Sequence, residues 1–296
     1  MNYDKINRTF DCEPTLTDTQ ILDFCRDGYL ILEGVIDDET NQRTCAYLNG
    51  ELPSNPSYIP EGRTRRDLER IRNSHEPSTL YLEEWFIDNV ILNPQVTGVL
   101  RSLLGRNVGL PVLMSRHSTN CPSPSQGWHH DGGFVSGPKI NFIEVFYVPQ
   151  DTPPEMGPTE IVPTSHLDPP YAPELAQGVS SAGSAGTLAV HSQSILHRKS
   201  DATASGVRHM LKYDYWRTVS PERDWIIEPD FNLGTALSDR IPRHLTKYVA
   251  DMYNWLCGIG DDFLITGGQS GPGVSENLIG PHYGPYYKGE SQPGSI

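Results

Sequence analysis

Cysteine is scarce in this sequence, and long apolar runs are missing. Only five cysteines occur among 296 residues, and no two of them form a CxxC pair. Neither a disulfide framework nor a zinc–thiolate site is therefore expected. No stretch approaches the roughly 18 consecutive apolar residues of a membrane-spanning helix, and the first residues lack a basic start followed by an apolar segment. We therefore expect a cytoplasmic protein that does not interact with membranes.

Positive charge is also in short supply. Lys and Arg number 23 against 37 Asp and Glu, which gives a formal net charge of −14. Such a chain repels the phosphates of nucleic acids and of anionic membrane surfaces. The one basic cluster, between Arg63 and Arg72, is interrupted by Asp67 and Glu69 and is typical of a solvated helix face. Nucleic acid is therefore not expected as a partner.

The remaining composition is that of a folded protein. Hydrophobic residues make up 36% of the chain, which is enough for a sizeable core. The 27 Gly and 25 Pro indicate many turns but stay below the roughly 25–30% that is typical of low-complexity chains. We expect a single domain over 1–296, with a helical flank at about 17–107, a β core at about 108–220, and a helix and Gly/Pro-rich tail at about 221–296.

The first hundred residues predict helices around one short strand. Thr17 and Gln20 have the spacing of a capping box, and apolar residues follow at helical spacing. Gly28 ends this helix, a strand follows at 29–32, and acidic residues from Asp37 begin a second helix. Later in this flank the pattern predicts a long loop over 51–79 and a helix from about Leu80 to Leu104.

The centre of the chain changes to β-type patterning. Short β-type runs alternate with Gly and Pro clusters, which predicts an all-β sandwich or barrel. The chain becomes helical again around Ile241 to Leu256. The predicted fold is therefore mainly β, with flanking helices at both ends. The predicted strands are 108–119, 140–148, 157–163, 186–191 and 207–217.

The segment 128–133 carries a candidate metal-binding motif. His129 and Asp131 are separated by one residue, so both side chains lie on one face of an extended segment, and His130 points the other way. Two ligands from one segment and a third from elsewhere make a facial metal site, which leaves positions open for substrate chemistry. The triplet alone does not decide the matter, because His166–Asp168 is a second one.

A third imidazole and a cation follow downstream. His197 precedes Arg208 by eleven residues, and Arg208 stands near the start of a predicted strand. Arginine binds the far carboxylate of a keto acid well, through bidentate, charge-assisted hydrogen bonds. One face of this strand is too polar for a dry core and predicts a wet pocket; its residues are Arg208, Met210, Lys212 and Asp214.

These residues resemble the phytanoyl-CoA dioxygenase-like branch of the iron(II)/2-oxoglutarate oxygenases. The resemblance covers about residues 17 to 260 and rests on four features in the order typical of the family. They are Phe24–Val35, Trp128–Asp131, Gly157–His166, and His197 with Arg208. The resemblance implies a double-stranded β-helix, or jelly roll, with flanking helices. It also implies iron(II) and 2-oxoglutarate as cofactors and O2 as co-substrate.

The resemblance assigns roles to the matched positions. His129, Asp131 and His197 are the expected iron ligands. Arg208 is the expected anchor for the distal carboxylate of 2-oxoglutarate, and His166 falls in a scaffold motif. Because the third residue of the metal triplet is Asp131 rather than Gly or Ala, no coordination position is vacated for a halide, and halogenation is disfavoured.

Some positions depart from the family pattern or are candidates for substrate contact. His130 stands where the family often has Gln, and it is a candidate for substrate contact or for a supporting position. Asn120 stands where many members have Lys, so it is the candidate second group that holds 2-oxoglutarate. Glu144 interrupts an apolar strand, where a half-buried carboxylate needs a partner. Trp216 is a pocket candidate by its strand position, and 201–205 replaces the usual Asn-x-Ser.

The resemblance implies oxidation of a small molecule, usually hydroxylation, with release of succinate and CO2. A specialised metabolite or amino-acid-like compound suits the acidic chain better than an acyl-CoA, whose phosphates would need a basic rim. The alternative is a cupin-type jelly roll that binds a metal or ligand without oxygenase activity. Arg208 separates the two hypotheses, because such a cupin has no need for a cation at that position. The sequence leaves the oligomeric state open.

Overall fold

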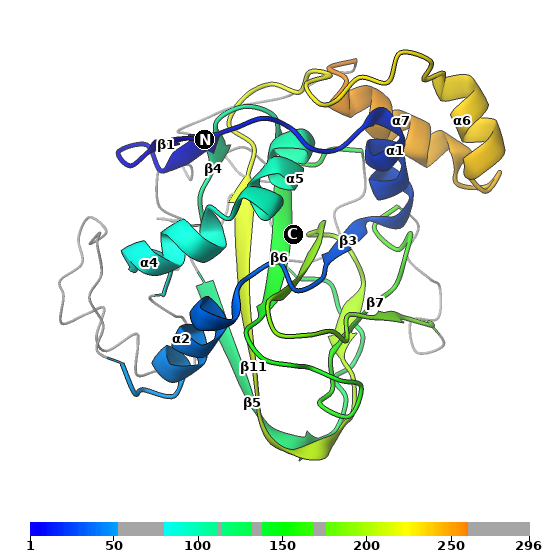
Figure 1. The fold of residues 1–296 in the computed structure, drawn as a ribbon. Coiled ribbons are helices and arrows are strands. Elements are labelled where there is room, and N and C mark those ends of the chain that lie inside the picture. Colours follow the sequence, from blue (N-terminus) through cyan, green and yellow to red (C-terminus); the bar gives the residue numbers. More distant parts are fainter. Residues whose placement is uncertain (53–79, 112–113, 132–137, 168–175, 260–296) are drawn as a thin grey trace, which may run out of the picture.

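The computed structural model describes residues 1–52, 80–111, 114–131, 138–167 and 176–259. Two antiparallel sheets form its centre, and helices flank them (Figure 1). The larger sheet has the strand order β1-β2-β4-β11-β6-β9-β3, with β5 also paired to β11, and the smaller sheet has the order β10-β7-β8. The predicted mainly-β fold with flanking helices is confirmed.

The strands of the two sheets are short except for β5 and β11. The larger sheet contains β1 (Asn2–Asp4), β2 (Thr9–Asp11), β3 (Tyr29–Leu32), β4 (Val108–Gly109), β5 (Met114–Ser123), β6 (Phe142–Val148), β9 (Thr187–Ser192) and β11 (Ala202–Trp216). The smaller sheet contains β7 (Thr159–Ile161), β8 (Val179–Ser180) and β10 (His197–Lys199). The strands expected at 140–148, 186–191 and 207–217 therefore correspond to β6, β9 and β11.

The helices lie mainly before and after the β core. They are α1 (Asp18–Asp27), α2 (Asp38–Leu48), η1 (Leu80–Leu82), α4 (Glu84–Phe86), η2 (Ile87–Ile91), α5 (Pro94–Leu104), α6 (Leu233–Arg240) and α7 (Thr246–Leu256). The helical stretch expected over 80–104 consists of four segments. The break before α5 falls where Pro94 cannot continue a preceding helix and the Asn93 side chain caps α5. Among the described residues no helix is long and apolar enough to cross a membrane.

The connection from α1 to β3 fixes the start of the sheet. The capping box of Thr17 and Gln20 begins α1 as expected. Gly28 ends the helix with φ 80°, and a Cβ there would lie 2.3 Å from Nδ1 of His166. His166 Nε2 donates a hydrogen bond to the Cys25 carbonyl at 3.0 Å. The buried imidazole therefore closes the end of α1, as a scaffold residue would.

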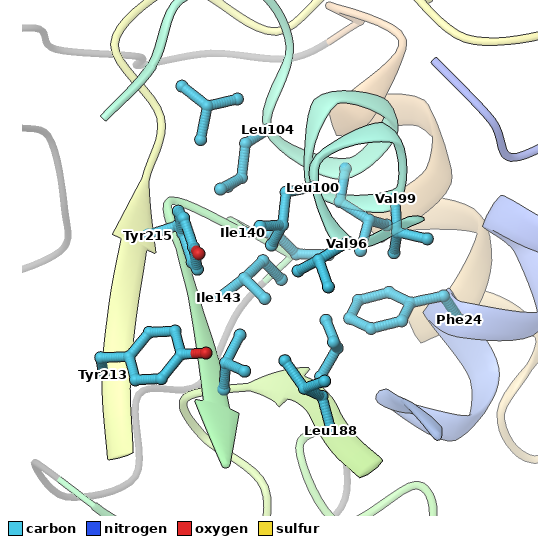
Figure 2. Close-up of a cluster of buried hydrophobic side chains, with 14 of the residues drawn as sticks. Phe24, Val96, Val99, Leu100, Leu104, Ile140, Ile143, Leu188, Tyr213 and Tyr215 are labelled. Atoms are coloured by element: carbon cyan, nitrogen blue, oxygen red, sulfur yellow. The ribbon is translucent and has the colours of Figure 1, made fainter. Parts of the chain in front are cut away.

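The larger sheet presents two different faces. Alternate residues of β11, namely Leu211, Tyr213 and Tyr215, are fully buried in the main hydrophobic core. Figure 2 shows this core, where α5 side chains such as Leu100 point toward the sheet. Burying one such leucine contributes about 1.5–3 kcal/mol. The alternate residues Met210, Lys212 and Asp214 of β11 face the opposite side of the sheet. Met210 packs there in a smaller hydrophobic cluster with Phe146, Val148, Ile161, Ala189 and Ile195.

Several predictions concern residues outside the described ranges. These are most of the loop over 51–79, the basic cluster between Arg63 and Arg72, and most of the Gly/Pro-rich tail. The boundaries of the proposed single domain stay a prediction.

Candidate metal centre

Three side chains from two segments that are far apart in the sequence converge in the structure. Nitrogen or oxygen atoms of His129, Asp131 and His197 all lie within 4.8 Å of one another. His197 Nε2 is 3.2 Å from Asp131 Oδ2, and His129 Nε2 is 3.8 Å from Asp131 Oδ1. This is the only such His, Cys, Asp or Glu group found in the described part of the chain.

Backbone pairing explains why residues so far apart in sequence meet. His129 and His197 form an isolated antiparallel bridge, and each amide donates to the carbonyl of the other at 3.0 Å. His197 also begins β10, where it pairs with Ile161 of β7. His129 therefore adds one bridged residue to the smaller sheet beside β10. Main-chain hydrogen bonds thus hold the segments of the two imidazoles next to each other.

Second hydrogen bonds orient both imidazoles. His129 Nδ1 lies 2.9 Å from the Gly127 carbonyl, and His197 Nδ1 lies 3.1 Å from the Ile195 carbonyl. A carbonyl can only accept, so each Nδ1 carries the proton and each Nε2 presents a lone pair. This arrangement is typical of histidines that bind a metal through Nε2.

Lys212 adds a cation that links the metal group to the larger sheet. Its Nζ contacts Asp131 Oδ2 and lies 3.1 Å from Oε1 of Glu144. Burial alone would raise the pKa of Asp131, but its contacts with the His197 imidazole and the Lys212 ammonium hold that pKa well below its usual range. Asp131 is therefore ionised at neutral pH. Strand alternation put Lys212 on the polar face, but the sequence did not reveal its contact with Asp131.

Arg208 lies on the same face of β11 and is almost completely buried. Its side chain is 2% exposed, Nη2 donates to Thr159 Oγ1 at 3.3 Å, and Nε has no hydrogen-bond partner among the described residues. Burial lowers its pKa to about 10, so it remains charged at neutral pH. A buried guanidinium without a carboxylate is costly unless an anion binds to it.

The register of β5 with β11 determines where Asn120, the candidate second group for 2-oxoglutarate, lies relative to Arg208. In the register of β5 and β11, Asn120 pairs with Val207, whereas Thr119 pairs with Arg208. Paired residues on neighbouring strands point to the same side, so Asn120 faces away from Arg208 and is exposed. The hydroxyls of Thr119 and Thr159 are the groups on the Arg208 side that sequence reasoning missed.

The three substrate candidates have different surroundings. His130 Nδ1 donates to the Ser194 carbonyl at 2.8 Å, which ties the metal motif to the loop before His197. Trp216 is 4% exposed, and its ring packs so closely on Gly109 that a Cβ there would lie 2.1 Å from it. Glu144 is 1% exposed and reaches the centre through its contact with Lys212.

A row of polar residues continues from Glu144 across the sheet. Glu144 pairs with Asp214 on β11 and with His191 on β9. Burial raises the pKa of Glu144 well above its ordinary value, and the charge of Asp214 raises it further. Burial also raises the pKa of Asp214, to about 7, and lowers that of His191 to about 3. The imidazole of His191 is therefore neutral.

Comparison with protein-family models gives one match. The model described as phytanoyl-CoA dioxygenase (PhyH) matches residues 24–210. No curated protein matches the chain significantly.

Solved structures match the fold. CytC3 with Fe(II) and alpha-ketoglutarate has a TM-score of 0.52 at 16% identity, covering 70% of this chain and 79% of that one. EctD from S. alaskensis with 2-oxoglutarate and 5-hydroxyectoine has a TM-score of 0.51 at 17% identity, covering 71% and 79%. The non-heme monooxygenase ThoJ–Ni complex has a TM-score of 0.50 at 18% identity, covering 80% and 98%. At such identities the likeness concerns the fold, and it confirms the predicted jelly roll.

Proposed function

Since the chain belongs to the phytanoyl-CoA dioxygenase (PhyH) family, which uses iron(II), 2-oxoglutarate and O2, we propose that it oxidises a small molecule with release of succinate and CO2. Hydroxylation is the proposed outcome, and a specialised metabolite or amino-acid-like compound is the proposed substrate. The observation that carries the proposal is the convergence of His129, Asp131 and His197.

The converging donors fit iron(II). Two neutral imidazoles with Nε2 lone pairs and one ionised carboxylate are the donor set of non-haem iron oxygenases. In this proposal His129, Asp131 and His197 hold the ion, which when bound supplies the activation of O2. Lys212 keeps the Asp131 carboxylate ionised and oriented by donating to one of its oxygens.

The Arg208 environment fits the distal carboxylate of 2-oxoglutarate. Its guanidinium is charged, buried and short of one hydrogen-bond acceptor at Nε among the described residues. A carboxylate would accept from it and remove the penalty of burying a charge alone. Thr159 already accepts from Arg208, so it orients the guanidinium. A cupin-type protein that does not bind 2-oxoglutarate would have no anion for this buried cation, which is why we favour an oxygenase.

Anaerobic spectroscopy and turnover test the proposal. Wild-type protein given iron(II) and 2-oxoglutarate without oxygen is expected to develop a weak visible charge-transfer band, and Asp131→Ala is expected to lose it. In air, a screen of candidate metabolites for stimulated succinate formation should give activity only with the wild type. Asp88→Ala, the same change at an exposed position, is the matched control. An Asp131→Ala variant with the wild-type band or turnover would refute the ligand assignment.

A further inference from the structure

The polar row beside the metal centre is a second group of side chains on the site face. Asp214, Glu144 and His191 are paired across three adjacent antiparallel strands, so their side chains lie side by side on one face. The His191 ring lies 5.7 Å from that of His197, centroid to centroid, and Glu144 shares the Lys212 ammonium with Asp131. The row therefore borders the place where a substrate would react.

The row has more buried hydrogen-bond acceptors than donors that reach them among the described residues. Glu144 Oε2 and Asp214 Oδ1 are buried, and neither accepts a hydrogen bond from a described residue. His191 Nδ1 donates to the Ser192 carbonyl at 3.1 Å, so Nε2 is a third acceptor, and it also lacks a donor among the residues described. Buried polar atoms are nearly always hydrogen-bonded in folded proteins. The missing partner is therefore a group rich in N–H or O–H donors.

Positive charge is short at the same place. Lys212 is the ammonium that contacts Glu144, and it also serves the Asp131 carboxylate. Burial is the main cause of the raised pKa values of Glu144 and Asp214, and neighbouring carboxylates raise both further, while Lys212 offsets these effects only in part. Asp214 is partly exposed whereas Glu144 and His191 are buried, so a ligand would reach the row from its Asp214 end.

We infer that the substrate is a compact cation whose ammonium group binds between Glu144 and Asp214. The inference rests on the proposed function and names the substrate class of the same site. An alkylammonium brings three donors and one positive charge, whereas an alcohol brings one donor and no charge. A carboxylate would add negative charge to the row. The net charge of −14 also attracts cations to the protein.

Binding of alkylammonium probes tests the inference without turnover. Wild-type protein loaded anaerobically with iron(II) and 2-oxoglutarate is titrated with propyl-, butyl- and hexylammonium. Each probe is matched with the alcohol and the carboxylate of the same chain length. Calorimetry measures affinity, and the visible band reports binding near the metal. We expect ammonium probes to bind at least tenfold more tightly than their matched alcohols and carboxylates.

Two isosteric variants locate the binding site. Glu144→Gln and Asp214→Asn each replace a carboxyl group, which a bound ammonium would hold ionised, by a neutral amide, and each is expected to weaken ammonium binding at least tenfold. Neither residue is a proposed metal ligand, but Glu144 shares the Lys212 ammonium with Asp131, so the visible band of each variant is measured first and only a variant that keeps it is titrated with the probes. Glu228→Gln is the matched control, because this half-buried carboxylate lies at the start of α1, where it accepts from Thr19. Thermal unfolding of each variant verifies folding, and either of the two site variants alone suffices for the test.

The outcomes separate this inference from the proposed function. Equal binding of alcohols and ammonium probes, unchanged ammonium affinity in the folded site variants, or no ammonium binding to wild-type protein that forms the band would each overturn the inference alone. Absence of the band in wild-type protein would refute the proposed function and the inference with it.

Discussion

The two faces of β11 differ in the kind of side chain that they bury. On one face Leu211, Tyr213 and Tyr215 are fully buried among apolar side chains, and the Tyr215 hydroxyl donates to the Ile91 carbonyl at 2.8 Å. On the other face Arg208 and Lys212 are charged residues in a largely buried setting. Among the described residues, the core face of β11 leaves the uncharged Tyr213 hydroxyl without a hydrogen-bond partner, whereas the site face leaves two ionisable side chains short of one, Arg208 at Nε and Asp214 at Oδ1.

The comparison teaches that neighbouring residues on this strand carry separable tasks. The core face stabilises the fold through apolar burial. The site face lowers the stability of the fold, because buried charges are unfavourable until a ligand supplies the partners that they lack. Substitutions on the two faces should therefore affect different measurements.

Leu211→Ala should produce the largest effect, on the core face. Leu211 is completely buried, so its truncation removes apolar contacts and leaves a cavity. The free energy of unfolding should fall by about 3 kcal/mol. Chemical denaturation measures the loss, and 2-oxoglutarate affinity of the folded fraction should stay as in the wild type. A variant with normal stability but weakened 2-oxoglutarate binding would contradict the division between the faces.

Arg208→Met should give the reverse pattern. The loss of charge-assisted hydrogen bonds to the distal carboxylate should weaken 2-oxoglutarate binding about 50-fold, or about 2 kcal/mol. Stability should remain equal or rise, since a buried charge disappears. Anaerobic titration of the visible band measures affinity, and Arg106→Met at an exposed position is the control. Unchanged affinity for 2-oxoglutarate would remove Arg208 from the site.

Acidification should weaken iron binding at the site. His129 and His197 must be neutral to bind metal, so protons compete with the ion. Iron affinity should therefore be lower at pH 5.5 than at pH 8. Anaerobic iron titrations at the two pH values measure the change. Equal affinities would speak against imidazole ligation.

The scaffold has its own response to acid, which the iron titration must account for. Burial lowers the pKa of His166 to about 4. The unfolded chain takes up this proton near pH 6.5 while the folded protein does not, so stability falls as pH drops from about 6.5 toward 4. Circular dichroism at each pH therefore verifies that the protein is folded during the titration.

Local sequence signals predicted helix ends and motif spacings better than they predicted which distant segments lie next to each other. The capping box at Thr17 and the left-handed Gly28 depend on residues a few positions apart, and both are found as expected. The spacing of His129 and Asp131 is also local. That His197 lies beside His129 depends on backbone pairing across a long stretch of chain, which the family resemblance suggested and composition could not.

Asn120 illustrates that a shift of one residue decides which side of the sheet a side chain faces. Asn120 and Thr119 are neighbours, and only the pairing register of β5 with β11 decides which one faces Arg208. The predicted strand ended at residue 119, whereas β5 continues to Ser123. The sequence alone indicated that Glu144 needs a partner. Identifying Lys212 as that partner required the register of β6 with β11.

The mutual amide bonds between His129 and His197 have a consequence for how the protein handles loss of its metal. These bonds join the two segments without any ion, so an emptied centre keeps its imidazoles in reach of each other. Reloading then requires only arrival of the ion and adjustment of side chains. If these residues hold the ion as proposed, loading the site would not require refolding of the two segments that carry the imidazoles.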